Sequence, residues 1–252
     1  MSVVLPVLVL VLVLGTASCG GTSLQDRPVA GRTPDTSAAR PADPVSVPTT
    51  TASTTAPAPT TTTQAPFVGT VSPVTAADLP STWRPGCPVG PEDLSMLHMS
   101  YWGFDDQPHV GTMVVATSVS SAVLKVFGTL YTERFPIRQM VPVDAFGGSD
   151  AASTAADNTA GFNCRYAVAP GPPQWSAHAY GEAIDVNTVE NPYIEGGQVL
   201  PPNATAYVDR SDIRPGMAYW GGELVDAFAS VGWQWGGRWS DPDYQHFSAT
   251  GN

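Results

Sequence analysis

Lysine is almost absent from this chain of 252 residues, in which Lys125 is the single example. Lysine and arginine together number 11 against 22 acidic residues, so the formal net charge is −11 at pH 7. A protein that binds nucleic acid or an anionic membrane surface through charge presents a basic patch. The composition provides too few cations for such a patch, and we expect no nucleic-acid partner.

Histidine is scarce as well, which limits the possible compositions of any metal site with two imidazoles. The four histidines are His98, His109, His178 and His246. The first two have no ligand-like residues beside them, and we interpret both as structural. The other two lie in polar, glycine-containing segments that also contain aspartates, so they are the candidates for metal ligands.

The N-terminal segment is apolar from Ser2 to Ala17 and ends at small residues before Cys19. This pattern predicts a signal peptide over residues 1–19, because the run is shorter than the roughly 20 residues of a spanning helix and Pro6 interrupts it. The string Thr-Ala-Ser-Cys-Gly resembles a bacterial lipoprotein box in which Cys19 is lipidated. The alternative is a plain secretory signal with an incidental cysteine.

Residues 20–75 are rich in Thr, Pro and Ala, with few large apolar side chains. Such a segment cannot bury enough surface to offset the entropy of ordering it, so we predict a disordered linker. If the roughly 45 residues up to about Pro66 are extended at roughly 3.1 Å each, they would span on the order of 140 Å. We therefore expect an exported protein, held by an N-terminal lipid on the outer face of the cell membrane and facing the cell wall.

Residues 76–252 are predicted to form one domain of the α+β class, because short strands mix with helices without regular alternation. Apolar residues indicate strands at 111–119 and 183–187 and helices at 120–134 and 223–231. In an oxidising compartment, Cys87 and Cys164 are expected to form a disulfide, and two buried free thiols are the alternative.

Three residues could bind one zinc ion, since a catalytic zinc usually takes three protein ligands and leaves one position for water. His178 and Asp185 lie seven residues apart, and His246 lies near the C-terminus. An unligated carboxylate must then accept a proton, and Asp243, three residues before His246, is the candidate. By themselves these residues could also be structural, and Asp243 could cap a turn.

Longer motifs resolve this ambiguity. The strings S-x-H-x-x-G-x-A-x-D, which begins at Ser176, and D-x-x-H-F, which begins at Asp243, are joined by N-T-A-G-F-N-C-R at 158–165 and N-P-Y at 191–193. Together they resemble the D-Ala-D-Ala carboxypeptidase family of zinc peptidases, which shares a fold with lysostaphin-type peptidases and the hedgehog signalling domain. The resemblance implies a small central antiparallel sheet flanked by helices, with a zinc cleft on the sheet.

The resemblance assigns Zn²⁺ to His178, Asp185 and His246, and the role of catalytic base to Asp243. It implies that Arg165 polarises the scissile carbonyl or holds a substrate carboxylate, although an ordinary ion pair is the alternative. Two further residues, Ser176 and Tyr180, either contact the substrate or stabilise the turn that presents His178. Three tryptophans, Trp233, Trp235 and Trp239, either line a groove or pack in the core.

The function implied is zinc-dependent hydrolysis of a peptide bond in peptidoglycan stem peptides by a monomer, foremost as a D,D-carboxypeptidase. An endopeptidase that cuts between L-Ala and D-Glu is an alternative, because an aspartate at the position of Asp243 also occurs in the endopeptidase-like branch. A zinc-stabilised wall-binding module without catalysis is the third reading.

Overall fold

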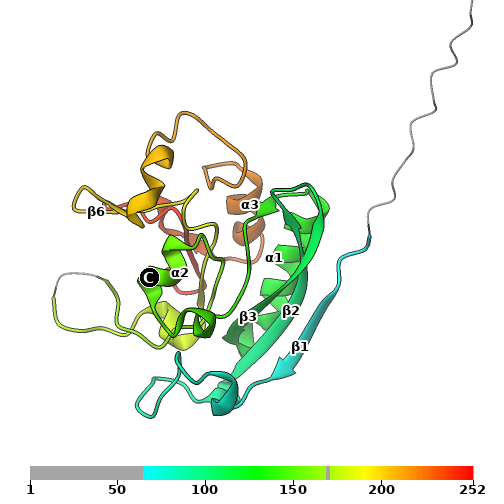
Figure 1. Cartoon of the computed structure of the whole chain (residues 1–252), viewed down its shortest axis with the longest axis vertical. Helices are drawn as coiled ribbons and strands as arrows, with labels where there is room; N and C mark the ends of the chain where they lie inside the picture. The colour runs from blue at the N-terminus through cyan, green and yellow to red at the C-terminus, as the bar shows by residue number, and fades with distance from the viewer. Residues whose placement is uncertain (1–64, 169–170, 252) are drawn as a thin grey trace, which may run out of the picture. The chain divides into compact units, whose positions relative to one another are not determined.

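A computed structural model describes residues 65–168 and 171–251 (Figure 1). The predicted signal peptide, the lipidation site Cys19 and the linker up to residue 64 lie outside the described residues. In the described part, no helix has the length and apolar character that crossing a bilayer requires.

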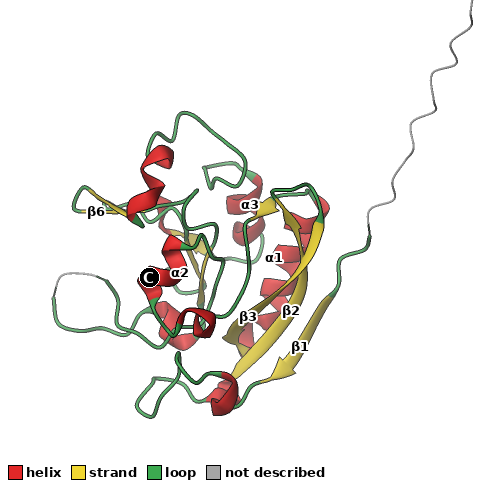
Figure 2. Ribbon diagram, viewed as in Figure 1, coloured by secondary structure: helices red, strands yellow, loops and turns green. Residues whose placement is uncertain are grey.

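The largest sheet consists of three antiparallel strands, β1 (Gly69–Pro73), β2 (Leu94–Gly103) and β3 (Pro108–Ala116), in that order. A short fourth strand, β4 (Pro136–Ile137), pairs in parallel with the end of β2. Helix α1 (Ser120–Thr132) lies along one face of this sheet and packs mainly against β2 (Figure 2). The strand predicted at 111–119 corresponds to β3, which begins and ends three residues earlier. The helix predicted at 120–134 corresponds to α1.

Helix α1 forms because its apolar residues recur at helical spacing. Val123, Val126, Phe127 and Leu130 are each 1% exposed. The helix stops at Thr132 because Arg134 takes a left-handed φ of 58° and Pro136 follows.

A second, smaller sheet carries the C-terminal part of the domain. It contains β5 (Ala183–Asp185), β9 (His246–Ser248) and β8 (Gln234–Trp235), all antiparallel. Helix α3 (Glu223–Ala229) contacts α1 and begins where the second helix was predicted. The remaining elements are α2 (Asp150–Ala155), the hairpin β6 (Tyr193–Glu195) and β7 (Gln198–Leu200), and the 3-10 helices η1 (Ala76–Asp78), η2 (Pro91–Asp93), η3 (Thr117–Val119), η4 (Val143–Phe146), η5 (Ala177–Tyr180), η6 (Pro202–Tyr207) and η7 (Gly236–Arg238).

The α+β class and the antiparallel sheets with flanking helices confirm the predicted fold class. A single apolar cluster joins the large sheet, α1, α3 and the small sheet. In it, Phe228 of α3 stacks on Phe247 of β9 with ring centroids 4.2 Å apart, and it meets Phe127 of α1 edge-on at 6.4 Å. Since Phe247 is 0% exposed and directly follows His246, the core holds that histidine's strand in place.

The boundary predicted between linker and domain is wrong at its end, because β1 lies within residues 20–75. Gly69 to Pro73 pairs along β2, and Phe67 packs against α1, with its ring centroid 5.9 Å from that of Tyr131. Composition marks the segment as polar and proline-rich, but an edge strand needs only backbone partners. The ordered fold therefore begins several residues before 76.

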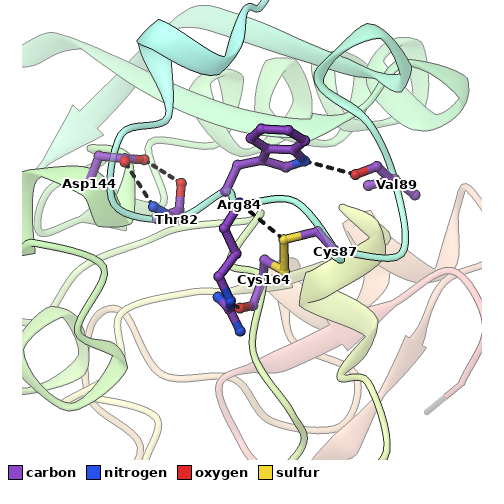
Figure 3. The surroundings of a disulfide bond; sticks show 7 residues. Thr82, Arg84, Cys87, Val89, Asp144 and Cys164 are labelled. Carbon is purple, nitrogen blue, oxygen red and sulfur yellow. Dashed lines mark hydrogen bonds between the residues drawn. A yellow bond between two sulfur atoms is a disulfide. The ribbon is translucent and has the colours of Figure 1, made fainter.

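A disulfide joins Cys87 to Cys164, as the sequence predicts (Figure 3). Arg84 reaches across it and donates from Nη1 to the backbone oxygen of Cys164 at 2.9 Å. Nearby, Asp144 accepts hydrogen bonds from the backbone N–H and the hydroxyl of Thr82. The bridge thus ties the segment before β2 to the segment that leads into the candidate site.

Replacing both cysteines by serine is expected to lower the free energy of unfolding by about 4 kcal/mol, because the bridge closes a loop with a sequence separation of 77. Equilibrium unfolding in urea would measure the loss. Wild-type protein unfolded in the presence of a reductant is the matched control and should show the same loss. An unchanged midpoint in both would contradict the stabilising role.

Candidate metal centre

The two predicted histidines and Asp185 meet in one buried cluster. The Nε2 atom of His178 lies 3.2 Å from Oδ2 of Asp185, and Nδ1 of His246 lies 3.2 Å from Oδ1 of the same carboxylate. The two ring nitrogens are also 3.2 Å apart. All three residues are at least 92% buried, because their exposures are 3%, 8% and 5%. The structure therefore brings together residues that lie 68 positions apart in the chain.

The first motif shapes the turn that presents His178. Ser176 caps η5, and its hydroxyl accepts a hydrogen bond from the backbone N–H of His178 at 3.3 Å. Gly181 ends η5 with a φ of 71°, and a Cβ there would lie 2.4 Å from the backbone nitrogen of Ala116. Only glycine satisfies both the left-handed conformation and the close approach to β3.

A backbone carbonyl selects the ring nitrogen that His178 offers to the cluster. Its Nδ1 lies 2.7 Å from the oxygen of Gly161. A carbonyl can only accept, so Nδ1 carries the proton and Nε2 presents its lone pair to the other ligands. Gly161 belongs to the N-T-A-G-F-N-C-R segment, which thus supplies the carbonyl that orients the His178 ring.

The other two ligands are placed by strand pairing. Asp185 ends β5 and His246 begins β9, and the two are direct register partners in the antiparallel ladder. Opposite residues of such a ladder put their side chains on the same face of the sheet. This places the carboxylate and the imidazole side by side on the small sheet, where the cleft was expected.

The donor set fits a zinc ion. Ligand atoms about 2.0–2.2 Å from a tetrahedral ion lie roughly 3.3 Å from one another, close to the 3.2 Å separations observed. Burial raises the pKa of the Asp185 carboxyl, but the imidazoles of His178 and then His246 outweigh it and hold that pKa well below its usual range. Asp185 is thus an ionised ligand, as metal binding requires.

Asp243 lines the same cavity as the three ligands. Its backbone N–H donates to Gly236 at 3.1 Å, and its carbonyl accepts from the backbone N–H of His246, so a turn holds it beside β9. Its Oδ1 atom is buried and has no hydrogen-bond partner within residues 65–168 and 171–251. Burial first, and then the charge of Asp185, raise the pKa of Asp243 to about 7. A carboxylate with an uncommitted oxygen and a pKa near neutrality suits proton transfer.

The cluster opens into a cavity of about 690 Å³, a size typical of small-molecule and peptide sites. Part of its lining comes from Arg165 and Trp175, and the Trp175 ring stacks on that of Tyr166 with centroids 4.3 Å apart. The lining also includes Tyr193 of β6, Leu200 at the end of β7 and the two prolines that follow it. The three candidate ligands and Asp243 thus share one cavity with these residues.

The remaining predicted site residues have different surroundings. Arg165 lines the cavity, but its Nε forms an ion pair with Asp150 at 2.7 Å. Ser176 caps η5, which is the turn-stabilising role, and it also lines the cavity, while its contact with a substrate stays a prediction. Tyr180 is 39% exposed and does not line this cavity, so the geometry gives its predicted substrate contact no support.

The three tryptophans separate in the structure. Trp233 is buried in the core beside Phe228, at a ring distance of 5.4 Å. Trp239 lines the cavity near His246, with ring centroids 5.3 Å apart. Trp235 is half-buried and lines a different cavity. Trp233 therefore packs in the core, and Trp239 lines the candidate site.

Sequence reasoning missed Asp150, Trp175 and Tyr193, which all line the cavity. Tyr193 belongs to the N-P-Y segment at 191–193, but no role had been assigned to it, and Asp150 and Trp175 lie outside the quoted motifs. Asp150 could have been suspected from its place after Ser149 at the start of a helix, but its pairing with Arg165 depends on the tertiary fold.

A second buried carboxylate lies five residues after Asp185. Glu190 is 1% exposed, and its Oε1 accepts from Arg138 at 3.0 Å, while Oε2 has no partner in the described part of the chain. Burial, followed by the neighbouring Asp157, raises the pKa of Glu190 from 4.5 to about 7. Its folded-state pKa therefore lies above that of the unfolded chain.

Glu190 consequently contributes stability that is fully present below about pH 4.5 and is lost as the pH rises through 7. Glu190→Gln, which resembles the protonated form, should remove this dependence and leave the variant more stable than wild type above pH 7, by about 2–3 kcal/mol. Unfolding free energies measured from pH 4 to 8 would test this. Parallel curves for the two proteins would contradict it.

Residues 170–249 match a family model described as D-alanyl-D-alanine carboxypeptidase. The matched segment contains the three candidate ligands and Asp243, whereas Arg165 lies before it. No curated protein and no solved structure matches the chain at a significant level.

Proposed function

We propose that this protein is a zinc peptidase that cleaves a peptide bond in peptidoglycan stem peptides, foremost as a D,D-carboxypeptidase that releases the terminal D-Ala. The observation that carries the proposal is the convergence of His178 Nε2, His246 Nδ1 and the Asp185 carboxylate beside the uncommitted Oδ1 of Asp243. The family model that matches this segment supports the choice of substrate.

His178, Asp185 and His246 would hold the ion, and when bound, Zn²⁺ supplies a Lewis acid that makes water acidic near neutral pH. Asp243 then accepts a proton at its free Oδ1 and returns it to the amine that leaves. Gly161 keeps the His178 ring in one tautomer throughout. Trp175 and Tyr193 line the same cavity and would position the peptide beside the ion.

Export and anchoring belong to the same proposal. The predicted signal peptide at 1–19, with lipidation at Cys19, and the Thr/Pro-rich linker would hold a monomeric domain within reach of the wall. The disulfide between Cys87 and Cys164 supports an oxidising compartment outside the cytoplasm.

The test is incubation of the zinc-loaded full chain with a stem pentapeptide that ends in D-Ala-D-Ala, followed by mass spectrometry. The proposal expects a tetrapeptide and free D-Ala as the products. Cleavage at another bond would reject the carboxypeptidase assignment and retain the peptidase. An intact pentapeptide, together with intact cross-linked muropeptides, would reject both.

An endopeptidase that cuts within the stem peptide is the second candidate, and one contact favours it. A carboxypeptidase must receive the substrate's terminal carboxylate, for which an available cation is suited. Arg165 is the one arginine or lysine in the lining of the described cavity, and it is already paired with Asp150 at 2.7 Å. Asp150 thus competes with a terminal carboxylate for Arg165.

Asp150→Asn is therefore expected to raise kcat/KM for a stem peptide with a free terminal carboxylate, relative to the same peptide with a terminal amide. Both partners are partly exposed, so the gain should correspond to about 1 kcal/mol, or roughly fivefold. Asp226→Asn, on the exposed face of α3, is the matched control and should leave the ratio unchanged. An unchanged ratio in Asp150→Asn would show that Asp150 does not restrain Arg165.

A further inference from the structure

A second cavity, of about 470 Å³, lies on the other side of the chain segment that carries Asp243. Asp243 and Gln245 line the first cavity, whereas Tyr244, between them, lines the second. Trp235 supports this segment, because its Nε1 donates to the carbonyl of Tyr244 at 2.9 Å. The chain from 243 to 245 is thus a wall with one cavity on each side.

The second cavity is lined mainly by aromatic rings and guanidinium groups. Trp220 stands out because 70% of its surface is exposed, which is unusual for so large an apolar side chain. The guanidinium of Arg238 lies over its ring at 4.6 Å, and the guanidinium of Arg210 lies over the ring of Tyr244 at 4.3 Å. Flat rings beside cations form a surface that can stack on a ring-shaped ligand while binding an acid.

The charge of this cavity is opposite to that of the chain as a whole. Its lining contains two arginines and no carboxylate, in a protein with a net charge of −11. Within residues 65–168 and 171–251, no acidic side chain forms an ion pair with Arg238 or Arg210. An anion at this position would therefore meet cations that are not already neutralised.

Arg210 adds a fixed charge at the base of the cavity. Its two terminal nitrogens donate to backbone carbonyls, among them that of Glu190 at 2.8 Å, and to Oδ1 of Asn191 at 3.1 Å. Its Nε is buried and has no acceptor in the described residues. Burial lowers the pKa of Arg210 to about 10, so it stays charged at neutral pH. This arginine is rigid, while the exposed Arg238 can adapt to a ligand at the mouth.

We propose that this cavity binds an acidic sugar residue of the glycan strand, namely a muramyl residue whose lactyl carboxylate carries no peptide. The inference rests on the proposed function, since the glycan strand is the polymer to which stem peptides are attached. The apolar face of the sugar stacks on Trp220, and the carboxylate pairs with Arg238. Because one wall separates the two cavities, a strand held here keeps neighbouring stem peptides close to Asp243.

Two sugars that differ only in the lactyl ether group, which carries the acid, provide the test. N-acetylmuramic acid has the lactyl carboxylate, and N-acetylglucosamine has the same ring without it. Titration of the full chain, followed through the indole N–H signals in NMR spectra, should give an affinity about tenfold higher for the acid, as a charge-assisted hydrogen bond provides. Arg238→Gln should remove the difference between the sugars, and Trp220→Ala should weaken both.

Arg134→Gln is the matched control, because Arg134 lies over Trp102 at 4.5 Å in the same kind of pair elsewhere on the molecule. It should leave both affinities unchanged. Equal affinity for the two sugars, absence of binding at millimolar concentration, or binding unaffected by Arg238→Gln and Trp220→Ala would overturn the inference. Sugar binding should persist in the Asp243→Asn variant and in the presence of a chelator. Loss of sugar binding and loss of peptidase activity are therefore separate results.

Discussion

Replacing Asp243 by asparagine is expected to lower kcat for stem-peptide hydrolysis by about 10²–10⁴-fold while zinc stays bound. Asparagine keeps the size of the side chain but cannot accept the proton. The buried Oδ1 of Asp243 has no competing partner in the described structure, so its capacity to accept is not used elsewhere. Initial rates with the pentapeptide, measured alongside the zinc content of each protein, would give the loss.

Asp241→Asn is the matched control, because it also replaces an aspartate by asparagine. Asp241 lies two residues before Asp243, and its side chain is exposed. That variant should keep its activity to within a few-fold. If Asp243→Asn retained wild-type kcat, or if it lost zinc and activity together, the role of base would be contradicted.

Replacing His178 by alanine is expected to abolish both zinc binding and the stabilisation that zinc provides. An ion that binds only the folded state stabilises it by about 4 kcal/mol when present at a thousand times its Kd. Wild-type protein should therefore show a marked rise in Tm when zinc is added, and His178→Ala should show none. Thermal unfolding with and without zinc, together with metal analysis, would measure both effects.

His98→Ala is the control for this experiment, because His98 lies exposed on β2, where its Nδ1 is 3.0 Å from the hydroxyl of Thr112. It should respond to zinc as the wild type does. A zinc-dependent rise in Tm that survived in His178→Ala would place the ion elsewhere.

The sequence predicted the candidate ligands because their motifs encode local geometry. Ser176 and Gly181 mark the two ends of η5, so the turn that presents His178 can be read from six consecutive positions. The meeting of Asp185 with His246 is of another kind, because it depends on the register of β5 against β9, 61 residues apart. Without the resemblance, spacing could not have paired those strands.

What the sequence did not predict depends on tertiary contacts. Strand β1 was placed in the linker because its stability comes from backbone pairing with β2 and from Phe67, not from its own composition. The pairing of Asp150 with Arg165 cannot be read from the sequence for the same reason, since the two residues lie 15 positions apart and the chain from α2 back to Arg165 follows no regular repeat. The predicted substrate contact of Tyr180 followed only from its place in the motif, and Tyr180 is not among the residues that line the cavity.

The most direct measurement of the metal centre is anomalous diffraction at the zinc absorption edge from crystals of the zinc-loaded protein. We expect one strong peak within about 2.2 Å of His178 Nε2, His246 Nδ1 and an oxygen of Asp185, with no peak in the Asp185→Ala variant. A map without a peak at these three side chains, or with the ion bound by other residues, would contradict the assignment.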